Sequence, residues 1–275
     1  MDVQKLIAEP DGKFRLKDRA PDETYGTTKA RAAKALPAHA EKLSHDHDLL
    51  YAEHKHGLLI VLQGMDASGK DGAIRHVMSG FNPQGSTVTS FKQPTSKELD
   101  HDFLWRIHQA VPGKGEIGIF NRSQYEDVLI VRVHKLVPKK VWSKRYEQIN
   151  QFEEMLTMNN VCILKFFLHI SREEQQKRFH ARLQDPSKNW KASVADFKEQ
   201  AFWSDYQEAY EDAINECSTK YAPWYVIPSD HKWFRNYAIS SVIVDTLESL
   251  GMTYPKADPD VLRAAEGEAE RQSPA

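Results

Sequence analysis

The chain has 275 residues, with 37 basic and 39 acidic side chains and a formal net charge of −2. A nucleic-acid-binding protein usually carries a clear basic excess, so this balance argues against nucleic acid as a partner. We find no run of about 20 apolar residues that could cross a membrane, and no apolar secretion signal at the N-terminus. Together with only two cysteines, Cys162 and Cys217, these features predict a cytoplasmic protein with no membrane partner.

The first part of the chain changes from polar to apolar patterning. Residues 1–26 are polar, contain two prolines, and predict an extended N-terminal arm outside the core. Residues 28–56 are rich in Ala, Lys, His and Glu and indicate a helix. The run LLIVL at residues 58–62 ends in a glycine turn, as is typical of a buried parallel strand. Apolar residues at helical spacing follow until Gly80 and predict a second helix.

The rest of the chain alternates between the two patterns. Apolar or β-rich runs predict further strands at residues 86–91, 117–120, 161–170 and 224–227. Apolar residues at helical spacing predict helices around residues 99–107, 146–156 and 234–250. Ser171, followed by Glu174, predicts a capping box at the start of another helix.

Strands that alternate with helices predict an α/β protein with a parallel sheet covered on both faces. Right-handed crossovers bring the carboxyl ends of such strands to one edge, where open α/β sheets bind ligands. We predict one domain at residues 27–254, between the arm and an acidic C-terminal tail at residues 255–275.

A glycine-rich loop follows the first predicted strand. Gly64, four further residues, Gly69 and Lys70 match a phosphate-binding loop, but Asp71 stands where Ser or Thr normally holds Mg²⁺. Backbone N–H groups and the helix dipole of such a loop attract phosphate, and Lys70 adds a positive charge. A chance match in a glycine turn is the alternative. The predicted phosphate-binding residues of this loop are Gly64, Ala67, Ser68, Gly69, Lys70, Asp71 and Gly72.

Two carboxylates in this loop, Asp66 and Asp71, would repel a polyanion unless a cation lay between them. We therefore predict that carboxylates hold Mg²⁺ here in place of the missing hydroxyl, with Asp66 as a ligand. Asp71 is better explained as an acid in the first turn of a helix, where the dipole favours it.

A second polar cluster follows the strand at residues 117–120. Asn121, Arg122, Glu126 and Asp127 stand where a Walker-B acid would be expected. An arginine with two acids could bind one phosphate and one metal ion at this position. An ordinary solvated loop is the alternative.

A basic segment follows the strand at residues 161–170. Arg178 and Arg182 are four residues apart and share a helix face, and Lys188 lies on a turn beyond the helix. This segment, about residues 171–195, predicts a lid that binds phosphate and excludes water. A solvated charged helix face is the alternative.

Several segments together resemble the polyphosphate kinase type 2 family over about residues 58–250. They are GMDASGKDG, FNPQG, SFKQPT, DFLWRIH, FNRSQYEDV, EQQKRFHARLQDPSKNWK and APWYVIPSD. The resemblance implies a three-layer α/β/α P-loop kinase fold with a five-stranded parallel sheet and a helical lid, and Asp71 is usual in that family. It also implies reversible transfer of a phosphoryl group between inorganic polyphosphate and nucleotides, with Mg²⁺ (or Mn²⁺), in a homodimer or homotetramer.

The resemblance also implies roles for single residues. Asp66, Lys70, Arg122 and Asp127 match catalytic positions, with Asp66 and Asp127 as metal ligands. Arg178, Arg182 and Lys188 are expected on polyphosphate. The residues expected on the nucleotide are Lys92, Arg106, Asn121, Arg122 and Glu126. The YEDV form of residues 125–128 resembles the subclass that accepts mono- and diphosphates, taking AMP to ADP and ADP to ATP, with guanosine nucleotides as further candidates.

Two other functions stay open at this point. A conventional ATP-dependent nucleotide kinase shares the fold and differs in the donor. A non-catalytic nucleotide- or phosphate-binding regulator would keep the loop without the chemistry, although Lys70 and two separate acidic clusters argue against it.

Overall fold

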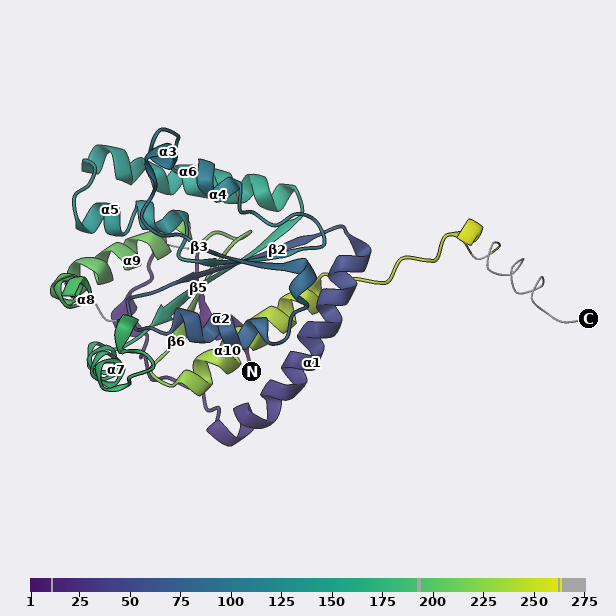
Figure 1. Ribbon diagram of the computed structural model, residues 1–275, viewed down its shortest axis with the longest axis horizontal. Helices are drawn as coiled ribbons and strands as arrows, with labels where there is room; N and C mark the ends of the chain where they lie inside the picture. The colour runs from purple at the N-terminus through teal and green to yellow at the C-terminus, as the bar shows by residue number, and fades with distance from the viewer. Residues whose placement is uncertain (11, 192–193, 262, 264–275) are drawn as a thin grey trace, which may run out of the picture.

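The computed structural model describes residues 1–10, 12–191, 194–261 and 263, and a single twisted sheet forms its centre (Figure 1). Its strands are β1 (Ile7–Ala8), β2 (Gly57–Gln63), β3 (Ser86–Ser90), β4 (Ile117–Asn121), β5 (Val161–His169) and β6 (Trp224–Pro228). They lie in the order β1-β6-β5-β2-β4-β3. Residues 192–193 of the predicted lid, and residues 262 and 264–275 of the predicted tail, lie outside the described residues.

The five predicted strands, β2 to β6, are all present and pair in parallel, so that part of the prediction is confirmed. Every residue of β2 is buried, because helices cover both faces of the sheet. Leu58 and Ile60 face one core cluster, and Leu59 and Val61 face the other. Alternate residues therefore enter opposite layers, as the period of a strand requires.

The prediction that the N-terminal arm lies outside the core is wrong. Leu6 and Ala8 are fully buried, and β1 adds an antiparallel edge strand through the pairs Ile7↔Tyr225 and Ala8↔Trp224. Farther along, the backbone N–H of Phe14 donates to Oδ1 of Asn215 at 2.8 Å. The apolar residues of this segment are too widely spaced to show a period, and only contact with β6 makes them part of the core.

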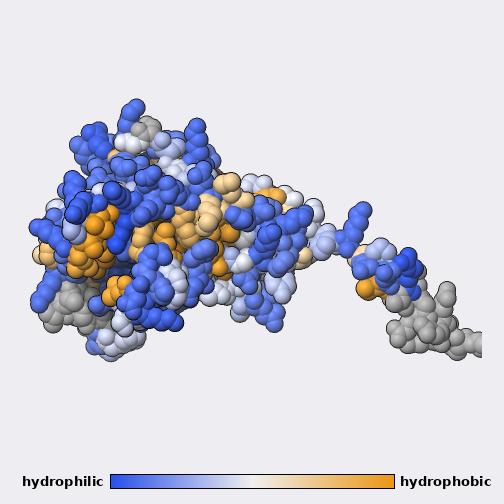
Figure 2. Space-filling view, turned by 90° about the horizontal axis from the view of Figure 1, so that it is seen from above, coloured by the Kyte–Doolittle hydropathy of each residue, from blue (hydrophilic) through white to orange (hydrophobic). Residues whose placement is uncertain are grey.

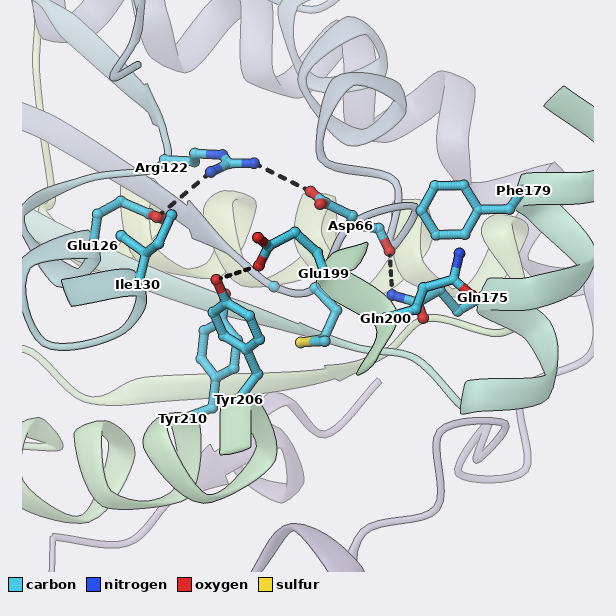
Figure 3. A pocket seen from close by; sticks show the side chains of 12 residues that line it. Asp66, Arg122, Glu126, Ile130, Gln175, Phe179, Glu199, Gln200, Tyr206 and Tyr210 are labelled. Atoms are coloured by element: carbon cyan, nitrogen blue, oxygen red, sulfur yellow. Dashed lines mark hydrogen bonds and ion pairs between the residues drawn. The ribbon is translucent and has the colours of Figure 1, made fainter. Parts of the chain in front are cut away.

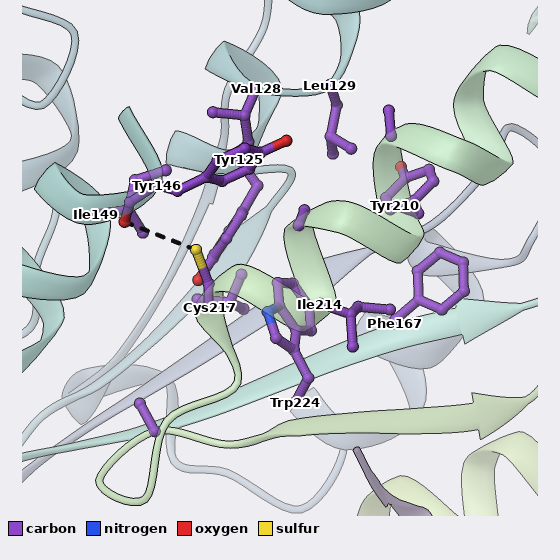
Figure 4. Close-up of a cluster of buried hydrophobic side chains, with 14 of the residues drawn as sticks. Tyr125, Val128, Leu129, Tyr146, Ile149, Phe167, Tyr210, Ile214, Cys217 and Trp224 are labelled. Carbon is purple, nitrogen blue, oxygen red and sulfur yellow. Dashed lines mark hydrogen bonds between the residues drawn. The ribbon is translucent and has the colours of Figure 1, made fainter. Parts of the chain in front are cut away.

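Two helical layers enclose the sheet (Figure 1). One core cluster joins the sheet to α1 (Lys29–Glu53), α2 (Lys70–Met78) and α10 (Lys232–Ser249). The other joins it to α6 (Lys139–Met158) and α9 (Trp203–Cys217), where Phe167, Ile214 and Trp224 pack together (Figure 4). This is the α/β/α arrangement that the sequence predicts.

The shorter elements complete the chain. The remaining α-helices are α3 (Ser96–Leu99), α4 (Trp105–His108), α5 (Ile130–Val133), α7 (Arg172–Gln184) and α8 (Val194–Glu199). Short 3-10 turns occupy Val3–Leu6, Leu16–Asp18, Pro83–Gly85, Gln124–Asp127, Asn189–Lys191 and Gln200–Phe202.

Two predicted helices differ from the structure. The helix predicted around residues 99–107 is divided into α3, which begins at a capping box of Thr95 and Glu98, and α4, before which Asp102 accepts from the N–H of Leu104. The helix α9 was not predicted, although the four-residue spacing of Tyr206, Tyr210 and Ile214 is a helical signal.

The outer surface is mainly hydrophilic on the face shown in Figure 2, with hydrophobic side chains gathered in a few places. Within the described part of the chain, no helix combines the length and the apolar character that crossing a membrane needs.

Candidate active site

The loop between β2 and α2 needs glycine at two positions. Gly64 and Gly69 have φ angles of +151° and +104°, which L side chains rarely adopt. A Cβ atom on Gly64 would lie 2.8 Å from Ser68 Oγ and 2.9 Å from the carbonyl oxygen of Leu168. Gly69 is the N-cap of α2 and supplies no side-chain cap. The first N–H groups of α2 therefore lie at the loop without a capping side chain, which favours an anion there.

Lys70 lies inside this loop. Its Nζ atom donates to the carbonyl oxygens of Gly64 at 2.6 Å and Met65 at 3.3 Å. Burial lowers the pKa of Lys70, and the nearby Arg122 lowers it further, while Asp66 opposes both effects. A phosphate in the loop would therefore supply negative charge to a cation that the protein alone compensates incompletely.

The ends of β2 and β4 meet, as their parallel register requires. Arg122, which follows β4, places Nη2 at 3.1 Å from Asp66 Oδ1 and Nη1 at 3.5 Å from Glu126 Oε2 (Figure 3). Glu126, together with Asp66, raises the pKa of Arg122 above its ordinary value. Asn121 Nδ2 donates to Asp71 Oδ1 at 3.1 Å. The structure thus brings the two predicted polar clusters together at one edge of the sheet.

The lid helix α7 is attached directly to the loop. Gln175 Nε2 donates to the carbonyl oxygen of Asp66 at 2.9 Å, and Arg178 Nη1 donates to those of Ala67 and Ser68 at 3.0 and 2.9 Å. The predicted N-cap is confirmed, since Ser171 Oγ accepts from the N–H of Glu174.

The second half of the predicted capping box is wrong. The N–H of Ser171 donates to Asp230 Oδ1, and the Glu174 carboxylate pairs with Arg178 instead. Arg178, one turn farther along the same helix, competes for the Glu174 carboxylate, whereas Asp230 is brought to Ser171 by the tertiary structure.

A basic cleft of about 600 Å³ opens over the loop and the lid. Its wall carries eight Lys or Arg side chains against three Asp side chains, although the whole chain is slightly acidic. The basic residues are Lys70, Arg75, Arg122, Arg178, Arg182, Lys188, Lys232 and Arg235, and the acidic ones are Asp66, Asp71 and Asp185. Arg75, Lys232 and Arg235 were missed from the sequence. Arg75 is three residues beyond the loop motif, but nothing local distinguishes the other two.

A smaller inner pocket of about 200 Å³ adjoins the same loop. Asp66, Arg122 and Glu126 form one side, and Tyr206 and Tyr210 of α9 form another (Figure 3). Burial raises the pKa values of both tyrosines, so their hydroxyl groups stay protonated near neutral pH.

One hydrogen-bond chain closes a wall of the inner pocket. Tyr206 donates from its hydroxyl to Glu199 Oε2 at 2.9 Å, and His134 Nε2 lies 3.0 Å from the same carboxylate. Phe179, Gln175 and Gln200 complete this side. The tyrosines and Glu199 were missed because no local pattern in the sequence places them beside the loop; the tertiary structure does.

Three predicted site residues lie in a separate group. Arg106 Nη1 donates to the carbonyl oxygen of Lys92 at 2.8 Å, and Asp127 Oδ1 accepts from Arg145 Nη1 at 2.9 Å. Burial raises the pKa of Asp127 to about 6, against the opposing effects of Arg145 and Arg106. Neither Lys92, Arg106 nor Asp127 lines the two cavities. Their predicted nucleotide and metal roles stay predictions.

The carboxylates of the site suit Mg²⁺ bound through Asp66 and completed by other ligands better than Mg²⁺ enclosed by protein side chains alone. Within residues 1–10, 12–191, 194–261 and 263, no group of three His, Cys, Asp or Glu side chains is placed to hold an ion. Mg²⁺ usually takes one or two carboxylates and completes its shell with water and substrate phosphates. Asp66 fits this pattern, because its side chain is one-third exposed and lines both cavities.

Comparison with known proteins agrees with this geometry. The family model described as Polyphosphate kinase 2 (PPK2) matches residues 26–254. The chain belongs to the polyphosphate kinase 2 family. An AMP/ADP-polyphosphate phosphotransferase of Meiothermus ruber is 52% identical over 258 residues, which cover 93% of this chain and 97% of that protein. An ADP-polyphosphate phosphotransferase of Rhodopseudomonas palustris is 48% identical over 249 residues, or 86% of each chain.

A solved structure of this polyphosphate kinase 2 family confirms the fold. The polyphosphate kinase 2 of Arthrobacter aurescens superposes with a TM-score of 0.92 at 42% identity, covering 97% of this chain and 96% of that one. The resemblance and the P-loop kinase fold inferred from the sequence are therefore confirmed.

Proposed function

We propose that the protein transfers a phosphoryl group reversibly between inorganic polyphosphate and nucleotides, with Mg²⁺ (or Mn²⁺), and that it takes AMP to ADP and ADP to ATP. One observation carries the proposal: a basic cleft and a smaller pocket meet at the phosphate-binding loop, and Asp66 and Arg122 line both. Two polyanions can therefore approach from two sides and meet at shared residues. The names of the relatives support the same reaction.

Each substrate suits one cavity. Polyphosphate is a uniform chain of charges, and the basic cleft offers positive charge along its length without a closely shaped wall. The acceptor phosphate of the nucleotide enters the inner pocket, where Arg122 is the basic side chain among the described lining residues and Asp66, Glu126 and Glu199 are the acidic ones. Tyr206 and Tyr210 add apolar surface and protonated hydroxyl groups on the opposite side.

Phosphoryl transfer needs alignment and charge compensation more than covalent chemistry from the protein. An oxygen of the acceptor phosphate forms a bond to the terminal phosphorus, and the bridging P–O bond to the shortened chain breaks. The loop N–H groups and Lys70 hold the terminal donor phosphate, and Arg122 compensates the charge that grows on the transferred group. Asp66 would hold Mg²⁺, which supplies further neutralisation of phosphate oxygens when bound.

The proposed range of acceptors, both mono- and diphosphates, is supported by a relative's name and by one short sequence motif. The relative from Meiothermus ruber is named for AMP and ADP, and the relative from Rhodopseudomonas palustris for ADP alone, at similar identities. The YEDV sequence at residues 125–128 supports the broader range, and its Glu126 lines the inner pocket beside Arg122. Guanosine nucleotides belong to the same proposal, since a relative from Pseudomonas aeruginosa is named a GDP-polyphosphate phosphotransferase.

A single assay tests donor and acceptor together. The purified protein is incubated with polyphosphate, Mg²⁺ and AMP, with no other donor, and we expect ADP first and ATP afterwards. Phosphorylation of nucleotides by ATP but not by polyphosphate would favour a conventional kinase. Nucleotide binding without any turnover would favour a regulator.

We also propose a cytoplasmic location and a homodimeric or homotetrameric state. Both cysteines are free, which suits a reducing compartment. Light scattering of the purified protein tests the oligomeric state.

A further inference from the structure

Arg235, in the first turn of α10, lies against the phosphate-binding loop. Its side chain is buried, with the residue only 3% exposed. A Cβ atom on Gly69 would lie 1.9 Å from Arg235 Nη1 and 3.6 Å from Arg178 Nη1, and one on Gly72 would lie 3.1 Å from Arg235 Nη2. The guanidinium therefore occupies the space that these two glycines leave open, and it lines the basic cleft.

The hydrogen bonds of Arg235 are incomplete. Its Nε and Nη2 atoms both donate to Oδ1 of Asn236, at 3.1 and 2.7 Å. Its Nη1 atom is buried and has no hydrogen-bond partner among the residues that the structure describes. A guanidinium carries five N–H donors, and a buried charge without compensation is costly to the fold. Burial and the neighbouring Arg178 lower the pKa of Arg235 to about 10, which shows how weakly its charge is compensated.

Arg178 differs in this respect, although it lies in the same cleft. Its Nε atom donates to Glu174, and Nη1 donates to the carbonyl oxygens of Ala67 and Ser68. Its Nη2 atom donates to the carbonyl oxygens of Ser229 and Asp230, at 2.6 and 3.0 Å. Every nitrogen of this guanidinium is used: Nε is paired within α7, and Nη1 and Nη2 join the lid to the loop and to the residues that follow β6.

We propose that Arg235 is a direct ligand of the phosphate chain in the basic cleft, and that Arg178 acts through the loop as a positioning residue. The inference rests on the proposed function, because it names a ligand for the cleft assigned to polyphosphate. An anion beside Gly69 and Gly72 would satisfy Nη1 and relieve the repulsion between the two arginines. Lys232, one turn earlier on α10, lines the same wall and adds to the positive charge there.

Replacing each of the two arginines by methionine is expected to give opposite results. Inorganic tripolyphosphate serves as the probe, with its dissociation constant measured by calorimetry and the thermal midpoint measured without ligand. Arg235→Met is expected to raise the dissociation constant about 10- to 100-fold, since a charge-assisted contact is lost, while the midpoint stays the same or rises. Arg178→Met is expected to lower the midpoint, because it removes the contacts that join three elements.

Further variants separate the explanations. Arg31→Met, an exposed arginine on α1, is the control and should leave the dissociation constant unchanged. Arg235→Gln repeats the test with a polar, neutral side chain and carries the same expectation if the methionine variant does not fold. Failure of the wild-type protein to bind tripolyphosphate would overturn both the proposed function and this inference. Wild-type binding with unchanged affinity in the folded Arg235 variants would overturn the inference alone, as would a lowered midpoint with unchanged affinity.

Discussion

Two buried cations show how differently one chain can treat a charge. Lys165, in the middle of β5, is fully buried and donates to Glu153 Oε2 at 2.6 Å, to the Tyr125 hydroxyl at 2.9 Å and to the carbonyl oxygen of Cys217 at 2.6 Å. Its three donors are all used, and Tyr125 and Cys217 appear within the surrounding cluster in Figure 4. Arg235 is buried almost as deeply, lines the cleft, and has one nitrogen without a hydrogen-bond partner among the described residues.

Burial alone therefore does not show whether a charged side chain serves the fold or binds a ligand. The protein completes the contacts of Lys165, so that this residue holds β5, α6 and the turn at Gln124–Asp127 together. It leaves the contacts of Arg235 incomplete in a side chain that lines the basic cleft. An unsatisfied donor beside a cavity is therefore the more informative observation about ligand binding.

The largest effect is expected from replacing Lys165, the buried cation whose hydrogen bonds are complete. Lys165→Met leaves the Glu153 carboxylate buried without its cation and should destabilise the protein by about 3–5 kcal/mol. The double variant with Glu153→Gln should recover much of this loss, because no uncompensated charge remains. Urea unfolding measures both. A loss below about 1 kcal/mol for the single variant would contradict the contrast with Arg235.

Lys70→Ala tests the cation at the centre of the loop. It should lower the rate of phosphoryl transfer by about 10²–10³-fold, since it removes a charge that acts on the transferred phosphate. The fold should be retained, because the hydrogen bonds of this lysine to described residues go to two carbonyl groups of the loop itself. Steady-state rates with polyphosphate and ADP, beside a circular dichroism spectrum, provide the check. Near-wild-type turnover would refute the loop assignment.

The pKa of Asp127 predicts a pH dependence of stability. A folded-state pKa of about 6, above the ordinary 3.8, means that the folded protein binds more protons than the unfolded chain between these values. The contribution of this group to stability therefore falls as pH rises from about 4 to 6 and is constant above that.

Asp127→Asn removes this titrating group. The stability of the variant relative to the wild type should therefore rise with pH over the range in which the contribution of Asp127 falls. Relative to the wild type, its free energy of unfolding should rise by up to about 3 kcal/mol between pH 4 and 6.5. Denaturant unfolding across this range measures the difference, in which carboxyl groups common to both proteins cancel. A difference that does not vary with pH would show that the carboxylate stays ionised in the fold.

The smallest expected effect concerns the outer lid. Arg182→Ala should raise the KM for polyphosphate about 3- to 10-fold at low salt, and the gap should shrink as salt is added, because screening weakens the wild-type contact. Lys177→Ala is the matched control, since its side chain is 80% exposed on the same helix and lies outside the cleft wall. Equal effects of the two substitutions would indicate general charge attraction only.

Much of the fold and about half of the site could be predicted from residues close together in the sequence. The run at residues 58–62 followed by Gly64, Gly69 and Lys70 indicates a strand, a turn and a helix start, because backbone conformation and periodicity depend on near neighbours. The meeting of Asp66 with Arg122 followed from strand order, since parallel strands end at one edge. The same reasoning from strand order placed Asp127 at this edge as well, but its carboxylate pairs with Arg145 and lines neither cavity.

Only the tertiary structure decided the remainder. The arm enters the core through Leu6 and Ala8 because β6 offers it a free edge, and the tyrosines of α9 reach the inner pocket because that helix packs beside the loop. The same holds for the arginines: Arg178 and Arg235 are chemically alike, and either could be predicted to bind phosphate. Which of them is already satisfied depends on carbonyl groups contributed by distant segments, and no local pattern contains that information.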